Sequence, residues 1–159
     1  MKVVSNSTCI IALLRVGRLT LLKDLFDRIL IPEEVYREIY VNGKEGFVEL
    51  EKVDLFEIKK IKNRRFFNLL RGLIDDGEAA SIILAIEEDA GLIILDDKDA
   101  RKIAEKLGLK VMGTAGILLL AKKKGIIEEI KPILEEMRMS GFYLSDSIIR
   151  IVLREAGEL

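Results

Sequence analysis

Two adjacent aspartates, Asp96 and Asp97, follow the apolar run Leu92–Leu95, which is typical of a buried strand. Asn6 follows another short expected strand, Lys2–Ser5, in the same way. Burying such polar groups without a partner is costly, and packing does not require them there. The carboxyl ends of parallel strands meet at one edge of a sheet, where ligands bind. The three side chains are therefore candidates for a functional site.

Two glutamates can reach the same edge: Glu78, in the first turn of an expected helix, and Glu38, on a partly apolar helix. Carboxylates gathered at one rim repel one another, and their pKa values rise unless a cation lies among them. A divalent metal removes this repulsion, lowers the pKa of bound water and can bind the oxygens of a phosphodiester. The cluster therefore predicts metal-assisted phosphodiester hydrolysis.

The residue types that the chain lacks narrow the choice of metal. There is no His in the sequence, which excludes Ser-His and Cys-His nucleophile pairs and any imidazole metal site. The single Cys9 excludes an internal disulfide and a cysteine zinc cage. Only oxygen ligands remain, and these favour Mg²⁺ or Mn²⁺ over zinc.

Each candidate also has a structural explanation. Helix capping competes for the Asp96-Asp97 pair, because a helix is expected to begin at Asp97 or Lys98. Stabilisation of the helix dipole accounts equally well for Glu78, and simple solvation accounts for Glu38. The residue types alone leave these alternatives open.

The composition describes a folded chain of 159 residues, half of them hydrophobic, with 26 basic and 27 acidic side chains. This length fits one domain, 1–159. No apolar run approaches the roughly 18 residues of a membrane span, and the polar run Ser5–Thr8 interrupts any signal-peptide pattern. We therefore expect a cytoplasmic protein with no membrane partner. The scarcity of Trp, Gln and Asn, with abundant Ile, Leu, Glu and Lys, resembles thermophile composition.

Apolar runs and helical periodicity alternate along the chain. Strands are expected at residues 2–5, 28–31, 55–58 (as an edge strand), 92–95 and 110–112. The alternation predicts an α/β fold with a central parallel sheet and helices on both faces.

The expected helices have recognisable ends. Pro32 suits the first position of a helix that runs to about Tyr40, and a loop is expected at 42–46. Asp76 is the expected cap of a helix over 77–89, which Gly91 ends. Further helices are expected after Asp97, over 114–124, and over 128–139 and 145–156, the last two forming a C-terminal part, 128–159, packed on the rest.

A basic stretch precedes two phenylalanines, and it consists of Lys59, Lys60, Lys62, Arg64 and Arg65, followed by Phe66 and Phe67. Phosphate contacts beside a base-stacking ring would have this pattern. A solvated strand end followed by core phenylalanines has the same pattern, and we favour it for the rings. Arg101 lies one turn beyond Asp97, so it could reach a phosphate near the metal or pair with Asp97.

Taken together, these pieces resemble the PIN-domain ribonucleases, the family that includes the VapC toxins, and more closely a prokaryotic PIN-like subgroup of unknown function. The matching pieces span nearly the whole chain: Val3–Thr8 with Ile10–Leu13, Ile31–Glu38, Asp76–Ala80, Leu95–Lys98 with Arg101 and Ala104, Gly113–Leu118 and Gly141–Ser145.

The resemblance implies a three-layer α/β/α sandwich, a Mg²⁺ or Mn²⁺ site, single-stranded RNA as substrate, frequent homodimers and a small antitoxin protein as partner. The family's acidic positions map onto Asn6, Glu38, Glu78 and the pair Asp96 and Asp97, with Asp97 slightly favoured as the ligand. The residues that we assign to RNA are Arg101, Thr114, Lys62 and Arg64.

Asn6 departs from the pattern, since the broader family usually has Asp there. Its carbonyl oxygen can still bind a hard cation, but the cluster loses one negative charge. Two hypotheses follow: a metal-dependent ribonuclease, or a catalytically weakened PIN-like module that binds RNA or a protein. A phosphoacceptor receiver domain is disfavoured, because Ser5-Asn6 stands where that type requires paired acids.

Overall fold

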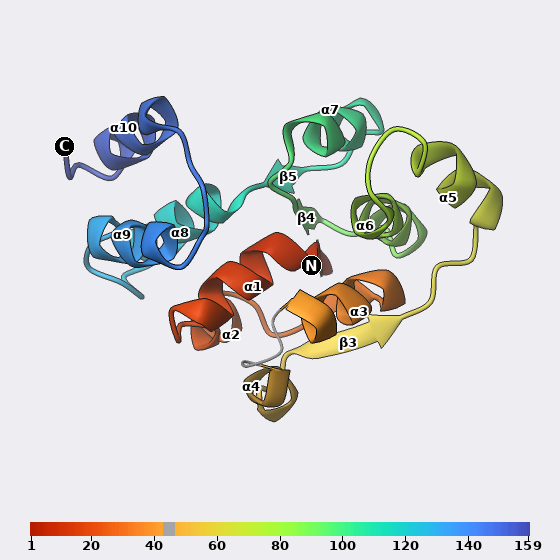
Figure 1. Ribbon diagram of the computed structural model, residues 1–159, viewed down its shortest axis with the longest axis horizontal. Coiled ribbons are helices and arrows are strands. Elements are labelled where there is room, and N and C mark those ends of the chain that lie inside the picture. Colours follow the sequence, from red (N-terminus) through yellow and green to blue (C-terminus); the bar gives the residue numbers. More distant parts are fainter. Residues whose placement is uncertain (43–46) are drawn as a thin grey trace.

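Five short strands form a parallel sheet in the computed structural model, which describes residues 1–42 and 47–159 (Figure 1). In chain order they are β1 (Val3–Ser5), β2 (Ile29–Pro32), β3 (Phe56–Lys59), β4 (Leu92–Ile94) and β5 (Val111–Met112). Their order in the sheet is β3-β2-β1-β4-β5, and every neighbouring pair is parallel. The expected parallel sheet is confirmed, including the edge position of β3.

The order of the strands reverses between β1 and β4. The chain builds outward from β1 to β3 and then returns to place β4 on the free side of β1. Ser5 lies opposite Ile94 in this pairing, and the next amide, of Asn6, donates to the Ile94 carbonyl at 3.0 Å. Asn6 and the residues after β4 therefore meet where ligands bind in open parallel sheets.

Helices cover both faces of the sheet. One face carries α1 (Ser7–Arg15), α2 (Thr20–Leu25), α3 (Glu33–Asn42), α4 (Phe47–Lys52), α8 (Thr114–Lys123), α9 (Lys131–Met139) and α10 (Asp146–Glu155). The other carries α5 (Arg64–Leu70), α6 (Asp76–Glu87) and α7 (Lys98–Lys106). The molecule is thus a three-layer α/β/α sandwich, as expected.

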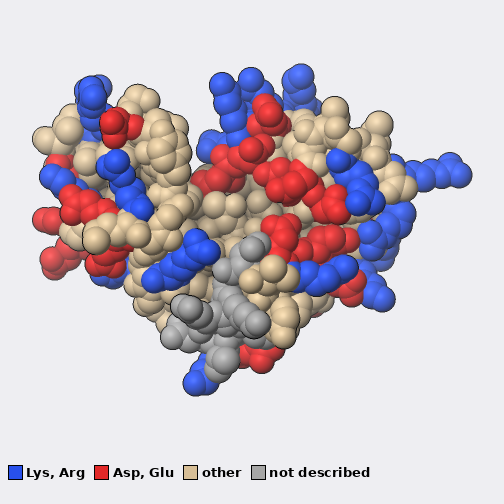
Figure 2. All heavy atoms as spheres, in the orientation of Figure 1, with Lys and Arg blue, Asp and Glu red and all other residues tan. Residues whose placement is uncertain are grey.

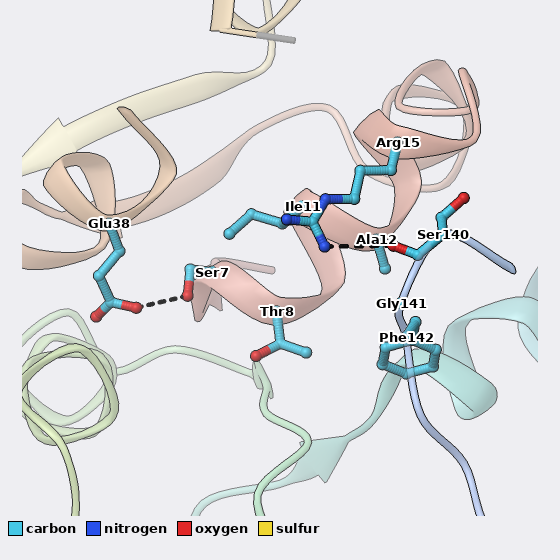
Figure 3. Close-up of a pocket in the computed structure, with 9 residues that line it drawn as sticks. All are labelled: Ser7, Thr8, Ile11, Ala12, Arg15, Glu38, Ser140, Gly141 and Phe142. Carbon is cyan, nitrogen blue, oxygen red and sulfur yellow. Dashed lines mark hydrogen bonds between the residues drawn. The ribbon is translucent and has the colours of Figure 1, made fainter. Parts of the chain in front are cut away.

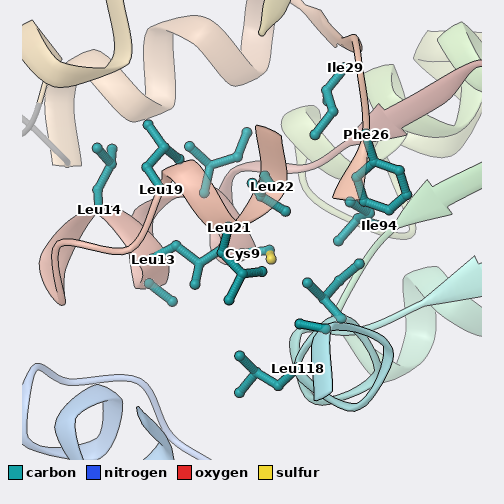
Figure 4. Close-up of a cluster of buried hydrophobic side chains, with 14 of the residues drawn as sticks. Cys9, Leu13, Leu14, Leu19, Leu21, Leu22, Phe26, Ile29, Ile94 and Leu118 are labelled. Atoms are coloured by element: carbon teal, nitrogen blue, oxygen red, sulfur yellow. The ribbon is translucent and has the colours of Figure 1, made fainter. Parts of the chain in front are cut away.

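The strands separate two hydrophobic clusters because successive side chains point to opposite faces. Val3 belongs to the larger cluster with α1, and Val4 to the smaller one with α6. Figure 4 shows the larger cluster around α1 and α2, which also includes Ile94 of β4 and Leu118 of α8. Full burial of each such side chain contributes about 1.5–3 kcal/mol. These clusters fix α1 and α6 against the strand ends that carry the polar residues.

Pro32 departs from its expected place. It is the last residue of β2, opposite Lys59, and α3 begins at Glu33. Pairing between β1 and β2 reaches only to Leu30, so β2 has a neighbour on one side alone at Pro32. A residue without an N–H is tolerated there.

The ends of α6 also differ from expectation. Asp75, not Asp76, caps the helix, and its side chain accepts from the Glu78 amide. Asp89, not Gly91, takes the left-handed conformation beyond the last turn, at φ 51°. Gly91 serves close packing instead, because a Cβ there would come within 2.4 Å of Met1 Cγ.

The remaining differences lie near α9 and in one loop. Helix α9 begins at Lys131 and not at 128. At this start, the Ile130 and Lys131 amides donate to the Glu158 carboxylate at 2.8 and 2.9 Å. Residues 43–46 of the expected loop lie outside the described residues, and Asn42 is the last residue of α3. No helix in the described part of the chain has the length and apolar character needed to cross a membrane.

Candidate functional site

Asn6 stands at the centre of the rim, between the end of β1 and the start of α1. Its side chain is buried, with 4% of the residue exposed, and its backbone is extended. The side-chain carbonyl Oδ1 has no hydrogen-bond partner among the described residues. Leaving a buried acceptor unsatisfied costs about 1–3 kcal/mol. Such an atom calls for an explanation, and an ion or a water molecule is a common one.

The two aspartates after β4 have different partners. Asp96 accepts from the Thr114 amide at 2.8 Å and from its hydroxyl at 2.6 Å. Burial raises the pKa of Asp96, while the Thr114 hydrogen bonds and the Arg101 charge act in the opposite direction. Asp97 is exposed and caps α7, accepting at Oδ2 from the Ala100 amide at 2.9 Å. The capping alternative therefore holds for Asp97, and its Oδ1 is not used in that bond.

Glu78 is fixed at the start of α6 by a reciprocal pair of hydrogen bonds with Asp75. The Glu78 amide donates to Asp75 Oδ1 at 2.8 Å, and the Asp75 amide donates to Glu78 Oε1 at 3.1 Å. This capping box satisfies two amides that the first turn leaves unpaired. It also holds the Glu78 carboxylate, only 8% exposed as a residue, beside the rim.

Glu38 reaches the same place from α3. Its Oε2 accepts from the Ser7 hydroxyl at 2.7 Å, as Figure 3 shows. Its carboxylate lies so close to Gly77 that a Cβ on that residue would approach Oε1 to 1.7 Å. Glycine at this position therefore lets α3 and α6 bring two glutamates together.

The electrostatics link these carboxylates. Burial is the main cause that raises the pKa of Glu78 to about 7, and the charges of Asp75, Asp97 and Glu38 raise it further. Burial likewise raises the pKa of Glu38, against the hydrogen bond from Ser7. Figure 2 shows Asp and Glu gathering over α3, α6 and the start of α7, beside a hollow that separates them from α8–α10. The predicted acidic residues thus face a common region.

The acidic residues do not form a ready-made chelate. Within residues 1–42 and 47–159, no three Asp, Glu or Cys side chains lie close enough together to hold a metal ion as they stand. Ser7 and Asp75 engage the two glutamates instead. The partner of Glu38 is the Ser7 hydroxyl, and the partner of the Glu78 carboxylate is the Asp75 backbone amide.

Two clefts open along this rim. The larger, of about 510 Å³, has Glu78, Asp96 and Asp97 on one side and the segment 141–145, with Ile148, on the other. The second, of about 330 Å³, runs past Ser7 and Glu38 (Figure 3). Both include Thr8, Gly141 and Phe142 in their walls. The segment between α9 and α10 therefore forms the far wall of the site.

A family model described as a PIN domain (DUF3368) matches residues 2–158. The chain belongs to the PIN-domain family. PIN domains have a nuclease-type fold and are generally dependent on a divalent metal. Among solved structures, this PIN domain is similar to a PilT N-terminus domain protein from the hyperthermophilic archaeon Sulfolobus solfataricus P2. The two share 14% identity at a TM-score of 0.45, over 91% of this chain and 98% of that one. Comparison with curated proteins gives no match.

The residues that we assigned to RNA occupy three different environments in the PIN domain. Arg101 and Asp96 flank Gly113, where a Cβ would come within 2.9 Å of each side chain, so Arg101 stands at the rim. Thr114 is fully buried, and its hydroxyl is used by Asp96. The assignment of Thr114 to RNA stays a prediction, and the hydrogen bonds to Asp96 indicate that the residue would act through that carboxylate.

The basic stretch lies beyond the clefts, on the side of α5. The Lys62 amide donates to the Glu87 carboxylate, and Arg64 pairs with Glu34 at 3.1 Å. Phe67 is buried beneath Arg64, whose guanidinium lies 5.3 Å from the ring centre. The core interpretation of the phenylalanines is confirmed for Phe67, while neither Lys62 nor Arg64 lines the larger cleft.

Sequence reasoning missed two parts of the PIN-domain site. The polar run after β1 indicated Asn6, but the hydrogen bond from Ser7 to Glu38 depends on how α1 meets α3. The segment 141–145 belonged to the family resemblance without a role, and only the packing of α9 and α10 brings it to the rim.

Stability without metal is expected to fall as the pH rises from about 4.5 to about 7. The pKa of Glu78 is raised to about 7 in the folded chain, so the folded state binds more protons than the unfolded state in this window. The loss in the free energy of unfolding is on the order of 1–3 kcal/mol, and urea denaturation in EDTA at several pH values measures it. Glu78→Gln should reduce the pH dependence of the free energy of unfolding. An unchanged slope in the variant contradicts the assignment of this dependence to the Glu78 carboxyl group.

Proposed function

We propose that this PIN domain is a metal-dependent endoribonuclease that cleaves single-stranded RNA with Mg²⁺ or Mn²⁺ as cofactor. One observation carries the proposal: the charges of Glu38 and Asp97 both act on Glu78, and the buried Asn6 follows β1, the strand that pairs with β4 just before Asp96 and Asp97. Glu78, Asp96 and Asp97 border an open cleft at the point where the strand order reverses. The family's nuclease-type fold and its general dependence on divalent metal support the same reaction class.

The donor set fits a hard divalent cation. Asn6, Glu78, Asp96 and Asp97 offer only oxygen atoms, which Mg²⁺ and Mn²⁺ prefer. The raised pKa values of Glu78 and Asp96 express mainly the cost of burying these carboxylates in their ionised form. A bound cation would offset that cost, lower the pKa of water and stabilise negative charge on a phosphodiester.

The chain's own groups have distinct tasks in this proposal. Ser7 orients the Glu38 carboxylate, and Thr114 orients that of Asp96. The Glu78 carboxylate, held at the rim by the Asp75 amide, would bind the cation through an oxygen atom. Arg101, beside Asp96, offers positive charge to a phosphate at the rim.

The proposal is tested with the purified chain and labelled single-stranded RNA of mixed sequence. We expect internal cleavage with Mn²⁺ or Mg²⁺, loss of cleavage in EDTA and its recovery when excess Mn²⁺ is restored. Cleavage that persists in EDTA would point to a contaminating nuclease or a different mechanism. Absence of cleavage with either metal over a broad set of RNA sequences contradicts the proposal.

A second candidate function is a PIN-like module that binds RNA or a protein without cutting. The neutral side chain of Asn6 favours it, because one fewer negative charge weakens the attraction for a divalent cation. The homodimer and the small antitoxin protein implied by the family resemblance stay predictions under either function.

A further inference from the structure

An exposed aromatic ring stands on the wall of the larger cleft that faces the acidic residues. Tyr143 is 83% exposed and lines this cleft together with Phe142 and Leu144. Across from it lie Glu78, Asp96 and Asp97. Because 83% of the residue is exposed, Tyr143 contributes little packing to the fold, and its ring is accessible to a ligand in the cleft.

The segment that carries Tyr143 is fixed at both ends. The Phe142 amide donates to the Met137 carbonyl at 2.9 Å, and the Phe142 side chain packs on the larger hydrophobic cluster. At the other end, Ser145 caps α10 by accepting from the Ile148 amide. Figure 3 shows Gly141 and Phe142 on this segment beside the start of α1. Tyr143 is thus presented from an anchored backbone, which limits the entropy lost when a ligand binds.

The two walls of the cleft differ in charge. One carries three carboxylates, whereas segment 141–145 and Ile148 are uncharged. Among the described residues that line the cleft, there is no Lys or Arg. A phosphate can approach the acidic wall only with a cation between them, and the opposite wall offers a ligand flat apolar contact instead. A nucleotide meets both conditions, because its base is flat and uncharged while its phosphate binds metal.

We propose that Tyr143 is the stacking platform for a base next to the scissile phosphate of single-stranded RNA, with Phe142 as its anchor in the core. This inference rests on the proposed function and adds the element that holds the strand. Bases stack on aromatic side chains with little regard to sequence, and single strands expose the faces that duplexes hide. The cleft therefore selects unpaired strands.

The chain has no Trp, so Tyr143→Trp introduces a single indole that reports directly on the cleft. We expect a single-stranded RNA 10-mer to quench its emission in a Glu78→Gln background, in which the strand is not cut. An abasic strand of equal length and charge should leave the emission unchanged. In fluorescence anisotropy, Tyr143→Leu should weaken RNA binding about five-fold or more, and Tyr143→Phe should keep it.

Tyr40→Leu is the matched control, because Tyr40 is an exposed tyrosine on α3 outside this cleft. Equal RNA affinity for the native chain and Tyr143→Leu overturns the inference. It is also overturned if Tyr143→Leu changes the sedimentation of the chain and leaves RNA affinity unchanged, which would assign the ring to a contact between copies. Quenching by RNA without any cleavage by the native chain keeps the platform and rejects the nuclease, so the two proposals fail separately.

Discussion

Glu78→Gln is expected to lower Mn²⁺-dependent RNA cleavage about a thousandfold while the fold stays intact. The substitution removes one negative charge from the rim and preserves the size of the side chain. Two unit charges about 4 Å apart interact by about 4 kcal/mol near a protein surface, and the charge of Mn²⁺ is twice a unit charge, so we take this energy as the lower bound of the loss. A loss of that size from the transition state corresponds to roughly three orders of magnitude in rate.

The same residue explains why the fold should survive. Glu78 accepts from the Asp75 amide through Oε1, and a glutamine at this position has a carbonyl oxygen that can replace it. The substitution also removes the burial cost that raises the pKa of Glu78. We therefore expect the melting temperature in EDTA to stay equal or to increase above pH 7.

Asp99→Asn provides the matched control, since Asp99 is an exposed acid in the first turn of α7, close in sequence to the site. It removes the same charge from the chain and should leave cleavage unchanged. Calorimetric titration with Mn²⁺ separates binding from chemistry. If Glu78→Gln binds Mn²⁺ and cuts RNA as the native chain does, Glu78 is not part of the metal site.

The parallel sheet was predictable because its strands leave a simple pattern. Residues 92–95 form a short apolar run between Gly91 and Asp96, as a strand covered by helices on both faces requires. Once the strands were placed, the rule that ligands bind beyond their carboxyl ends selected Asn6, Asp96 and Asp97 without knowledge of any side-chain contact.

The position of the α6 cap shows where local reasoning stops short. Asp75 and Asp76 are both good capping residues, and the sequence before Gly77 suits either. The spacing from Asp75 to Glu78 is the signal that decides, because the two partners of a capping box stand three positions apart in the sequence. Glu78 was predicted to act in the site or to stabilise the helix dipole, and the structure places it both in the capping box and in the wall of the larger cleft.

Tertiary contacts set the rest of the site, and no local pattern encodes them. The approach of Glu38 to Gly77 needs α3 and α6 to cross at the rim, and the hydrogen bond from Ser7 needs α1 beside them. Burial of Thr114 follows from the contact between α8 and the strand ends. The sequence shows which residues carry oxygen atoms, whereas packing decides which of those atoms remain available.

Asn6→Asp is expected to raise Mn²⁺-dependent cleavage about tenfold or more. The native Oδ1 is buried and has no hydrogen-bond partner in the described part of the chain, and the substitution adds one negative charge, shared between the two carboxylate oxygens. Because the change lies in the low-dielectric part of the site, the added attraction for a divalent cation is worth a few kcal/mol. The gain should appear at Mn²⁺ concentrations that do not saturate the native chain.

Without metal, the same substitution should destabilise the chain. A carboxylate at position 6 would be buried near Asp96, so its pKa in the folded chain would lie above its pKa in the unfolded chain. The free energy of unfolding would therefore fall as the pH rises past the pKa of the unfolded chain. We expect a loss of about 1–3 kcal/mol at pH 8 in EDTA, less at pH 5, and recovery with Mn²⁺. Asn63→Asp, at the exposed cap of α5, is the control and should respond to none of these conditions. Thermal melts of both variants measure the difference, and a loss in Asn6→Asp that Mn²⁺ does not restore would place the ion elsewhere and favour the binding module.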